Sequence, residues 1–486
     1  MLADRVSSLA VPEDLVSFSD GRNYLVVNPA SGAWVLLDPD DMDVVRRLAA
    51  GLPLVTIDRK LVERALARLV LRGVAGLPDQ HPPVLQVDAP LKVVYYAVTH
   101  GCNLGCPYCY ASSGRRAPDE LSTAEALDLI DQIAAMGAQT VVFTGGEALL
   151  RRDLFDLAER VRERGMSANV ITNATLIRTQ AIARRIAAEF SMVSVSMDGG
   201  TAESHDRTRG RGTFAKTTKA LRLLKEAGVR PYVNHVVTSE NLDELPELQA
   251  LLAELDIAGL RIQHHSPMGR GAGDDLGFAW DDYLKLHKST WGTPQARGLM
   301  PDGPVTGKQP GTRINCGMGG NEIGIDPRGN VTACKLLTED VHIAGNIRQT
   351  QLSDVFTSGP LADLRSNSVL AGNNLRDCRS CYVRGGCGGG CRAFHMAHSG
   401  DLKRNSRSLC RILRHQLIAS MWAAAGVDME KFVELGDAPF HPHLVATGER
   451  HPAYGDQGPA RPGDEDEGAL TTSQPRSRLR MTGGKP

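Results

Sequence analysis

A strand-then-helix pattern that repeats six times constrains the fold of this chain more than any other feature. Between residue 91 and about residue 265, short β-rich segments alternate with segments of helical periodicity. The predicted strands are KVVYYAVT, TVVFTG, ANVITN, MVSVSMD, PYVNHVVT and LRIQHH. Their continuous apolar character is typical of parallel strands that helices cover on both sides. The pattern predicts an α/β fold, either a barrel or a doubly wound sheet.

Residues suited to chemistry follow the ends of the predicted strands. Three cysteines come after the first strand, a Gly-Gly-Glu sequence after the second, and polar side chains after the third and fourth. These residues are Cys102, Cys106, Cys109, Gly145, Gly146, Glu147, Asn173, Ser196 and Asp198. Barrel enzymes place their chemistry at the C-terminal ends of the strands. We therefore expect one site at this edge of the sheet.

Composition narrows the class of protein and its partners. The 486 residues carry a formal net charge of −1 at pH 7, so bulk electrostatics give no sign of a nucleic-acid or membrane partner. The start, MLADRVSSLA, lacks the apolar core of a secretory signal, and the apolar run LIASMWAAAGV is too short to cross a bilayer. We expect a cytoplasmic protein whose ten cysteines bind metal rather than form disulfides.

The rest of the chain divides into further units by composition. NYLVVNP and GAWVLLDP predict a β-hairpin, and two segments of helical periodicity follow it. A helix is expected near DDYLKLHK, and the seven remaining cysteines lie beyond it. The predicted units are a first domain (1–78), a linker (79–90), the barrel (91–270), a bridging region (271–312), a cysteine-rich domain (313–425) and a disordered tail (446–486).

The first cysteine cluster, CNLGCPYC, raises the question of what three thiols bind. Three thiolates do not complete a tetrahedral zinc site, so zinc would need a fourth ligand such as His100. A cubane of four irons held by three cysteines instead leaves one iron open to a substrate or cofactor. The spacing alone leaves both alternatives open.

The sequence C-x3-C-x2-C after a first barrel strand, with Tyr108 before the last cysteine, resembles the signature of radical S-adenosylmethionine (SAM) enzymes. The resemblance implies a partial (β/α)6 TIM barrel with a 4Fe–4S cluster at Cys102, Cys106 and Cys109. It also implies that S-adenosylmethionine binds the open iron. Such an enzyme is an oxidoreductase that cleaves S-adenosylmethionine to a 5′-deoxyadenosyl radical, which abstracts hydrogen from the substrate.

Motifs at the later strand ends are similar to those of the same family. TGGEALL resembles the motif whose acceptors take the methionyl ammonium, although Ala148 replaces the usual proline. SVSMDG resembles the fourth-strand motif near the methionine or ribose, and SPMGRG resembles the sixth-strand segment against the adenine. Singly, each also fits an ordinary turn, helix cap or surface residue. The implied cofactor contacts are Tyr108, Gly145, Gly146, Glu147, Asn173, Ser196, Asp198, Arg209, Gly269 and Arg270, with Arg209 as the partner of the methionyl carboxylate.

The second set of cysteines resembles the SPASM extension of radical SAM enzymes that act on peptides. Its pattern is C-x12-G-x4-C, then CRSCYVRGGCGGGC, then a last cysteine. The resemblance implies two auxiliary 4Fe–4S clusters, although close cysteine pairs also occur in zinc sites. One cluster would have four ligands, Cys378, Cys381, Cys387 and Cys410. The other would have three, Cys316, Cys334 and Cys391, with an unidentified fourth ligand.

Lys335, directly after Cys334, departs from one branch of this family. Enzymes that oxidise a sulfatase serine or cysteine to formylglycine typically have an acidic base at this position. Lys335 therefore argues against sulfatase maturation, and the plain alternative is a solvated lysine. The general base is not identifiable from the sequence.

The front unit resembles the peptide-chaperone fold that binds leader sequences of ribosomally made peptides. Such a domain takes the leader as an extra strand at an exposed sheet edge. A generic winged helix or a cap for the barrel are the alternatives, and the lack of a basic stripe disfavours DNA binding.

Together these features predict a radical SAM peptide maturase that acts on a ribosomally synthesised precursor, with an intramolecular crosslink as the expected product. A flavodoxin or ferredoxin is the expected electron donor. The alternatives are a sulfatase maturase, a quinone-cofactor peptide modifier, a non-catalytic iron–sulfur protein and a zinc-stapled peptide-binding scaffold. His235, His264 and His265 lie near strand ends, where a core or rim role is the simpler expectation.

Overall fold

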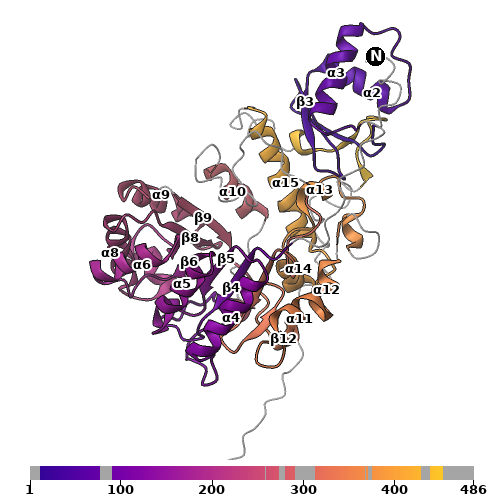
Figure 1. Cartoon of the computed structure of the whole chain (residues 1–486). Helices are drawn as coiled ribbons and strands as arrows, with labels where there is room; N and C mark the ends of the chain where they lie inside the picture. Colours follow the sequence, from indigo (N-terminus) through magenta and orange to yellow (C-terminus); the bar gives the residue numbers. More distant parts are fainter. Residues whose placement is uncertain are drawn as a thin grey trace, which may run out of the picture.

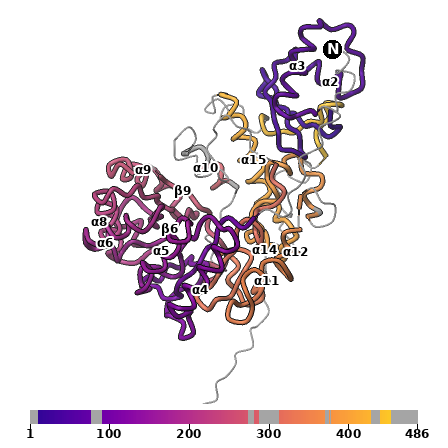
Figure 2. Tube along the Cα trace, in the orientation of Figure 1, coloured from indigo at the N-terminus to yellow at the C-terminus, as the bar shows by residue number. Residues whose placement is uncertain are grey.

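The computed structural model describes residues 11–76, 90–257, 259–272, 280–290, 312–366, 368–369, 375–427 and 438–452. Residues 79–89 of the predicted linker, most of the bridging region and residues 453–486 of the predicted tail lie outside these ranges. In Figure 1 the N-terminal unit lies at the top, the strand–helix unit at the lower left and the cysteine-rich unit between them. The Cα trace follows the same arrangement (Figure 2).

Six parallel strands form the centre of the largest sheet and confirm the predicted repeat. They pair in sequence order, each parallel to the next. The strands are β4 (Val93–Ala97), β5 (Thr140–Thr144), β6 (Ser167–Thr172), β7 (Met192–Ser196), β8 (Tyr232–Val237) and β9 (Gly259–His264). Because all six run in one direction, the loops after them meet at one edge of the sheet.

Helices alternate with these strands and cover the outside of the sheet (Figure 1). They are α4 (Thr123–Ala135), α5 (Leu154–Glu163), α6 (Gln180–Glu189), α7 (Ala202–Arg209), α8 (Thr213–Glu226) and α9 (Leu245–Glu254). All of them except α7 bury apolar side chains, as with Leu129, Leu157 and Leu221, against Val94, Phe143 and their neighbours in one core. The sequence also sets where they begin, since Ser122 and Glu125 form a capping box at the start of α4.

The cysteine-rich unit extends this sheet by three strands that the sequence analysis did not predict. They are β10 (Glu322–Ile325), β11 (Asn330–Thr332) and β12 (Ile343–Asn346). β10 pairs in parallel with β4, and β11 and β12 continue as antiparallel neighbours. The unit also contains α11 (Leu352–Thr357), α12 (Gly359–Arg365), α13 (Arg384–Cys387), α14 (Arg392–Ser399) and α15 (Arg407–Ala424). The two units therefore share a sheet, and α10 (Trp280–Thr290), the helix expected in the bridging region, packs on α15.

The N-terminal unit is a small sheet with two helices. The predicted hairpin is confirmed as β2 (Tyr24–Val27) and β3 (Trp34–Leu37), followed by α2 (Pro39–Ala49) and α3 (Arg59–Leu71). Two strands were not predicted, β1 (Val16–Ser19) and β13 (His443–Leu444), which pair with each other. Residues 446–452, expected to belong to a disordered tail, instead bridge back from Arg450 to His443.

The N-terminal sheet packs directly on the cysteine-rich unit. Phe18 and Trp34 share a core with Trp422 of α15 and with Tyr382, which comes just before α13. The Gly385 N–H donates to the Pro29 carbonyl at 2.7 Å, and a Cβ atom on Gly385 would lie 2.2 Å from the Ala30 carbonyl oxygen. A side chain at this glycine would force the two units apart, so the contact requires glycine. Within the described residues, no helix is long and apolar enough to cross a membrane.

Candidate active site

The loop after β4 carries the first cysteines and is folded back on itself. The Cys102 N–H donates to the Gly114 carbonyl at 2.8 Å, and the Gly114 N–H donates to the His100 carbonyl at 3.0 Å. Cys102, Cys106 and Cys109 are free and half-buried. Burial raises the pKa of Cys102 and Cys106, so their thiols are protonated unless a metal centre replaces the proton.

Gly145 and Gly146 support the start of this loop from β5. The Gly146 N–H donates to the Thr99 carbonyl at 2.8 Å. A Cβ atom on Gly145, whose φ is +137°, would lie 2.4 Å from the Thr99 carbonyl oxygen, and one on Gly146 would lie 2.2 Å from the Gly101 carbonyl oxygen. The two backbones therefore touch only because both residues lack side chains.

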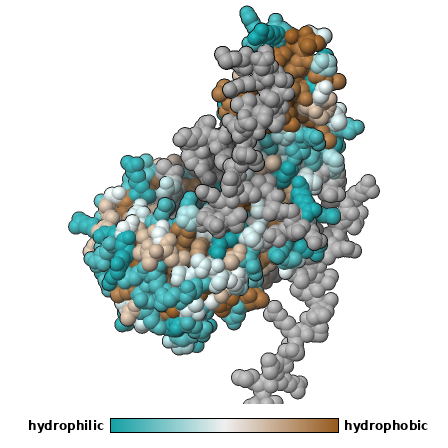
Figure 3. All heavy atoms as spheres, turned by 45° about the vertical axis from the view of Figure 1, so that its right-hand side comes forward, coloured by the Kyte–Doolittle hydropathy of each residue, from teal (hydrophilic) through white to brown (hydrophobic). Residues whose placement is uncertain are grey.

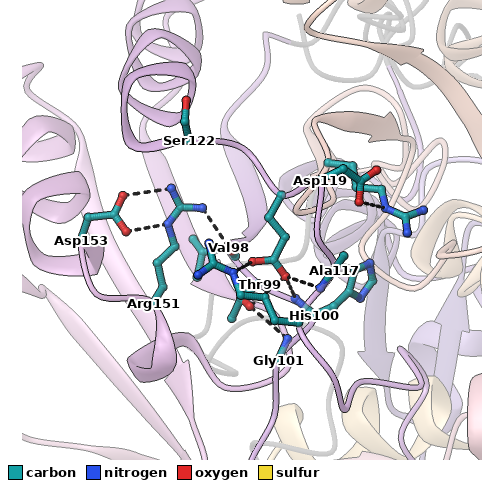
Figure 4. A network of polar contacts seen from close by, with 12 residues as sticks. Val98, Thr99, His100, Gly101, Ala117, Asp119, Ser122, Arg151 and Asp153 are labelled. Atoms are coloured by element: carbon teal, nitrogen blue, oxygen red, sulfur yellow. Dashed lines mark hydrogen bonds and ion pairs between the residues drawn. The ribbon is translucent and has the colours of Figure 1, made fainter.

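Glu120 also holds the start of this loop, through Thr99, His100 and Ala117, which Figure 4 labels. Its carboxylate is buried and accepts hydrogen bonds from the Thr99 hydroxyl at 3.0 Å, the His100 N–H at 2.8 Å and the Ala117 N–H at 3.1 Å. Arg116 pairs with it at 2.7 Å. The sequence analysis did not single out Glu120, because one acidic residue in a loop carries no motif.

Arg151 is a second buried charge in this network. It donates to the Val98 carbonyl at 3.0 Å and forms two hydrogen bonds to Asp153 (Figure 4). A cavity of about 280 Å³ opens between these groups. Thr99, Gly101, Cys102, Gly114, Arg116, Glu120, Leu150 and Arg151 line it. The start of the cysteine loop therefore borders a cavity that polar and charged side chains line in part.

Glu147 and Asn173 join β5, β6 and the cysteine loop. The Glu147 carboxylate is buried and accepts from the Thr172 hydroxyl at 2.6 Å and the Asn173 N–H at 2.7 Å. Burial raises its pKa although these hydrogen bonds oppose the rise. The Asn173 side chain donates to Asn103 of the cysteine loop at 3.0 Å. Both predicted residues therefore position the loop, and a direct cofactor contact stays a prediction.

Asp198 is fully buried after β7 and holds Arg209 and Tyr108. Its carboxylate pairs with the Arg209 guanidinium at 2.6 Å and accepts hydrogen bonds from the Tyr108 hydroxyl and the Val236 N–H. Burial alone would raise the pKa of Asp198, but the adjacent Arg209 charge and these donors lower it to about 2. Asp198, Arg209 and Tyr108, all expected to contact the cofactor, therefore form one cluster. The ionised Asp198 carboxylate positions the other two side chains.

The Arg209 guanidinium binds Asp198 through only two of its three nitrogen atoms. Asp198 takes the Nε and Nη2 atoms, at 2.6 Å and 3.3 Å. Among the described residues, no acceptor forms a hydrogen bond with Nη1. The guanidinium carbon lies 5.8 Å from the centre of the Tyr108 ring. This geometry leaves Arg209 able to bind a carboxylate, as the sequence predicts.

Gly269 and Arg270, after β9, hold the far end of the cysteine loop. Gly269 has φ +61°, and a Cβ atom there would lie 2.2 Å from the Tyr110 carbonyl oxygen. Arg270 donates to the carbonyls of Cys106 at 3.0 Å and Ser113 at 2.5 Å. The structure therefore places Arg270 against the loop backbone, while the expected approach of this segment to an adenine stays a prediction.

The other predicted polar residues lie nearby. Ser196 is half-buried at the end of β7, and His235 is buried in electrostatic contact with Asp198. Burial lowers the pKa of His264 to about 4, and His265 is buried beside Gly271. These positions agree with the expected core or rim role.

Electrostatic contacts among the remaining seven cysteines are compatible with the two predicted groups, whose role as cluster ligands stays a prediction. Burial and the neighbouring Cys381, Cys410 and Cys378 raise the pKa of Cys387 to about 12, which places these four thiols together. Burial and Cys316 raise the pKa of Cys391 to about 11, and Cys391 is in turn a neighbour of Cys334. All ten cysteines are free of disulfides.

Among the described residues, no three or more His, Cys, Asp or Glu side chains converge closely enough to hold one metal ion. In a cubane each thiolate binds a different iron. The assignment of these cysteines as cluster ligands stays a prediction.

Lys335 is not a solvated lysine. Its Nζ lies 4.0 Å from the centre of the Tyr95 ring. Although burial opposes its charge, nearby Tyr95, Tyr110 and Glu322 raise its pKa. Lys335 therefore lies between the first cysteine loop, which contains Tyr110, and Cys334 of the second set.

Two family comparisons match the chain. Residues 96–252 match the Radical SAM superfamily, and residues 316–382 match an iron–sulfur cluster-binding domain, SPASM. Among curated relatives, mycofactocin maturase MftC of Mycolicibacterium smegmatis is 34% identical over 63% of this chain and 79% of the relative. AdoMet-dependent heme synthase of Methanosarcina barkeri is 28% identical over 65% of this chain and 95% of the relative. PqqA peptide cyclase of Granulibacter bethesdensis is 28% identical over 70% of this chain and 94% of the relative.

Solved structures share the fold. Native anSMEcpe with bound AdoMet has a TM-score of 0.55 at 20% identity, over 71% of this chain and 99% of that chain. Streptococcus suis SuiB bound to precursor peptide SuiA has a TM-score of 0.54 at 16% identity, over 83% of this chain and 100% of that chain. These likenesses confirm the predicted radical SAM fold with a cysteine-rich extension. With its three-cysteine loop, six parallel strands and 34% identity to a curated relative, the chain belongs to the radical SAM superfamily, whose enzymes use S-adenosylmethionine and a 4Fe–4S cluster.

Proposed function

We propose that this chain is a radical SAM oxidoreductase that modifies a ribosomally synthesised precursor peptide. Two of its relatives, MftC and PqqA peptide cyclase, are named as a maturase and a peptide cyclase, and a similar fold was solved with a precursor peptide bound. The observation that carries the proposal is an open sheet edge in the N-terminal unit. That edge lies beside a groove lined by both apolar side chains and arginines, and it suits an extended peptide.

The proposed peptide site follows β3. The sheet order is β13–β1–β2–β3, so β13 covers one edge, and the structure describes no strand on the outer edge of β3. A groove of about 280 Å³ runs beside this edge. Its walls are Trp34, Val35 and Leu36 of β3, Arg68, Leu71 and Arg72 at the end of α3, and Ala424 and Ala425 at the end of α15.

The groove has the chemistry of a strand-addition site. Leu71 is a large apolar side chain that lines the groove and is 84% exposed, so it is accessible to an apolar side chain of a partner. Hydrophobic residues also gather on the visible face of the N-terminal unit (Figure 3). A leader peptide is the proposed occupant: its backbone would pair with β3, and its apolar side chains would cover Leu71.

In the barrel, the chain's residues would bind and orient the cofactor. Cys102, Cys106 and Cys109 are the proposed ligands of the SAM-binding cluster, which when reduced supplies a 5′-deoxyadenosyl radical from S-adenosylmethionine. Arg209 is the proposed partner of the methionyl carboxylate, and Asp198 holds it at 2.6 Å in the buried site. The seven other cysteines are the proposed ligands of two auxiliary clusters.

The expected electron donor is an acidic, low-potential flavodoxin or ferredoxin, and it would dock behind Cys102. Around the cavity there, each acidic side chain has an arginine partner. The pairs are Arg116–Glu120, Arg151–Asp153 and Arg328–Asp119. Arg115 and Arg152 are exposed and have no ion pair among the described residues. They are the chain neighbours of Arg116 and Arg151, which line the cavity with Leu150 and Cys102, and their positive charge would suit an acidic partner. A cytoplasmic location would supply such a donor.

The heme-synthase relative provides a second candidate, a radical SAM enzyme that acts on a tetrapyrrole. The experiment that separates the two is anaerobic co-expression with each short peptide encoded beside the gene, followed by mass spectrometry. A loss of two mass units supports a crosslink or desaturation. An unchanged peptide, with conversion of a tetrapyrrole instead, would contradict the proposal.

Leader binding is tested separately by fluorescence anisotropy with the labelled N-terminal part of that peptide. Leu71→Glu places a charge in the groove and should weaken binding by about tenfold or more. Leu52→Glu is the matched control, because Leu52 is 52% exposed but outside the groove. Equal affinity for both variants would contradict the proposed site.

A further inference from the structure

Cys316, Cys334 and Cys391 provide one thiolate too few to complete a 4Fe–4S cluster. The structure brings an acidic residue, Glu322, to the same place. The Glu322 N–H donates to the Gly317 carbonyl at 3.2 Å, next to Cys316 in the chain. Glu322 therefore begins β10 directly beside the first of the three cysteines.

The second cysteine, Cys334, lies just past β11, against the face of β10 that carries Gly324. β10 and β11 pair antiparallel, with Gly324 opposite Thr332 and Ile325 opposite Val331. This pairing ends at Thr332, where the chain turns: the Thr332 hydroxyl donates to the Cys334 carbonyl at 3.0 Å, which brings Cys334 back over Gly324, two residues after Glu322. The Gly319 N–H also joins the two chains here, since it donates to both the Glu322 and Ala333 carbonyls.

The face that Glu322 occupies is fixed by its neighbours in β10. Ile323 and Ile325 are fully or almost fully buried and point into the barrel core. Gly324 is on the opposite face, where a Cβ atom would lie 3.0 Å from the Cys334 carbonyl carbon. Because side chains alternate along a strand, Glu322 shares the face of Gly324 and projects toward the cysteines.

The Glu322 carboxylate also lies within electrostatic range of all three cysteines, Cys316, Cys334 and Cys391. Lys335 lies within electrostatic range of the same carboxylate.

We propose that Glu322 is the fourth ligand of the auxiliary cluster held by Cys316, Cys334 and Cys391. The proposal rests on the cluster assignment made above and goes beyond it, because it closes a site that the cysteines alone leave open. One carboxylate oxygen bonds the fourth iron; no electron is transferred. The ionised carboxylate brings the same single negative charge that a thiolate would bring. This cluster would then have no iron free for substrate or S-adenosylmethionine.

The test asks whether the fourth iron accepts an external ligand. The full chain with Cys102, Cys106 and Cys109 all changed to Ala lacks the SAM-binding cluster and its open iron. In this background the probe is 13C-labelled cyanide, added anaerobically to the reduced protein, with 13C hyperfine coupling measured by pulsed electron paramagnetic resonance. Iron and sulfide are counted in every sample, so that loss of a cluster is seen directly.

We expect no 13C coupling with Glu322 intact or in Glu339→Gln, an exposed acid of the same unit, and strong coupling in Glu322→Ala. Cyanide binding to the protein with Glu322 intact would overturn the proposal, as would the absence of binding to an intact cluster in Glu322→Ala.

If Glu322→Ala loses the iron of one cluster, Glu322→Cys decides the outcome. A thiolate replaces the carboxylate as ligand, so we expect the iron to return and the spectrum of this cluster to shift. Failure of cysteine to restore the iron would overturn the proposal. Absence of any auxiliary iron in the background protein would overturn the cluster assignment itself, and the proposal with it.

Discussion

Arg270 donates from its Nε to the carbonyl of Cys106 at 3.0 Å and thereby joins the loop after the sixth parallel strand to the loop after the first. A second bond, to the Ser113 carbonyl, continues the same contact. The loops that follow β4 and β9, the first and last of the six parallel strands, are thus in contact with each other. The six strands must therefore curve into a partial barrel. The cysteines are held at the point where this curve closes.

Arg270→Ala is therefore expected to loosen the cysteine loop. Hydrogen bonds from a charged donor contribute about 1.5–3 kcal/mol each, so the free energy of unfolding should fall by about 3 kcal/mol. Iron analysis after anaerobic reconstitution should show the loss of one cluster. Arg261→Ala is the control, since Arg261 is exposed on β9 and makes no such contact. Full iron content in Arg270→Ala would show that the loop holds its shape without this residue.

Gly146→Ala and Gly114→Ala test the close backbone contact behind the cysteines. A Cβ atom on Gly146 would lie 2.2 Å from a backbone oxygen, whereas one on Gly114 meets nothing within 4 Å. Overpacking typically costs 1–3 kcal/mol, so Gly146→Ala should lower stability by about 2–3 kcal/mol and Gly114→Ala by much less. Urea unfolding measures both. Similar midpoints for the two variants would contradict the described packing.

His205 predicts a loss of stability in mild acid. It is fully buried, and its Nδ1 accepts the Asp198 N–H at 3.3 Å, which requires the neutral ring. Burial lowers its pKa from 6.5 to about 4, with a further contribution from Arg209. The unfolded state therefore takes up the proton first. The contribution of His205 is complete above pH 6.5 and falls as the pH drops toward 4.

At pH 5 this linkage amounts to about 2 kcal/mol relative to pH 7. His205→Asn keeps an acceptor near the Nδ1 position and removes the titration. Its stability, measured by urea unfolding at both pH values, should therefore fall by about 2 kcal/mol less than that of the natural chain. An equal loss in both proteins would assign the acid sensitivity to other groups.

Charge reversal at Arg115 and Arg152 tests the proposed docking site of the electron donor. We expect the double variant, with both changed to Glu, to slow reduction by a photoreduced flavodoxin by about tenfold or more at low salt. Stopped-flow absorbance of the iron–sulfur chromophore measures the second-order rate constant. Reduction by the methyl viologen radical cation, which needs no docking surface, should not slow.

The matched control reverses two lysines of α8, Lys216 and Lys219, which are also exposed. This change alters the net charge by the same amount at a distant helix. Equal slowing in the two double variants would show that net charge, rather than this face, governs the rate. If methyl viologen also failed to reduce the protein, the cluster assignment would be at fault instead.

The sequence predicted the fold where periodicity is strong. All six parallel strands and the β2–β3 hairpin occur where the β-rich segments indicated. The strands of the cysteine-rich unit were missed because β11 has only three residues and β10 contains a glycine. The pairing of β13 with β1 joins residues more than 400 positions apart, and no local pattern indicates such a contact.

For the site, spacing identified the cysteine groups, but it did not reveal what the neighbouring residues touch. Arg270 was expected near a cofactor, and nothing in the sequence indicated that its side chain also binds the loop backbone. Lys335 was expected in solvent and instead lies over Tyr95. Such contacts depend on how distant strand ends meet, so a motif gives the residue type but not its partner.

The measurement that tests the central claim most directly is the formation of 5′-deoxyadenosine. The anaerobically reconstituted chain is incubated with dithionite, S-adenosylmethionine and the precursor peptide encoded beside its gene, and the products are quantified by mass spectrometry. The account predicts 5′-deoxyadenosine together with a modified peptide, and neither when Cys102, Cys106 and Cys109 are changed to Ala. Equal 5′-deoxyadenosine from the natural chain and the triple variant, or none above background from either, would contradict it.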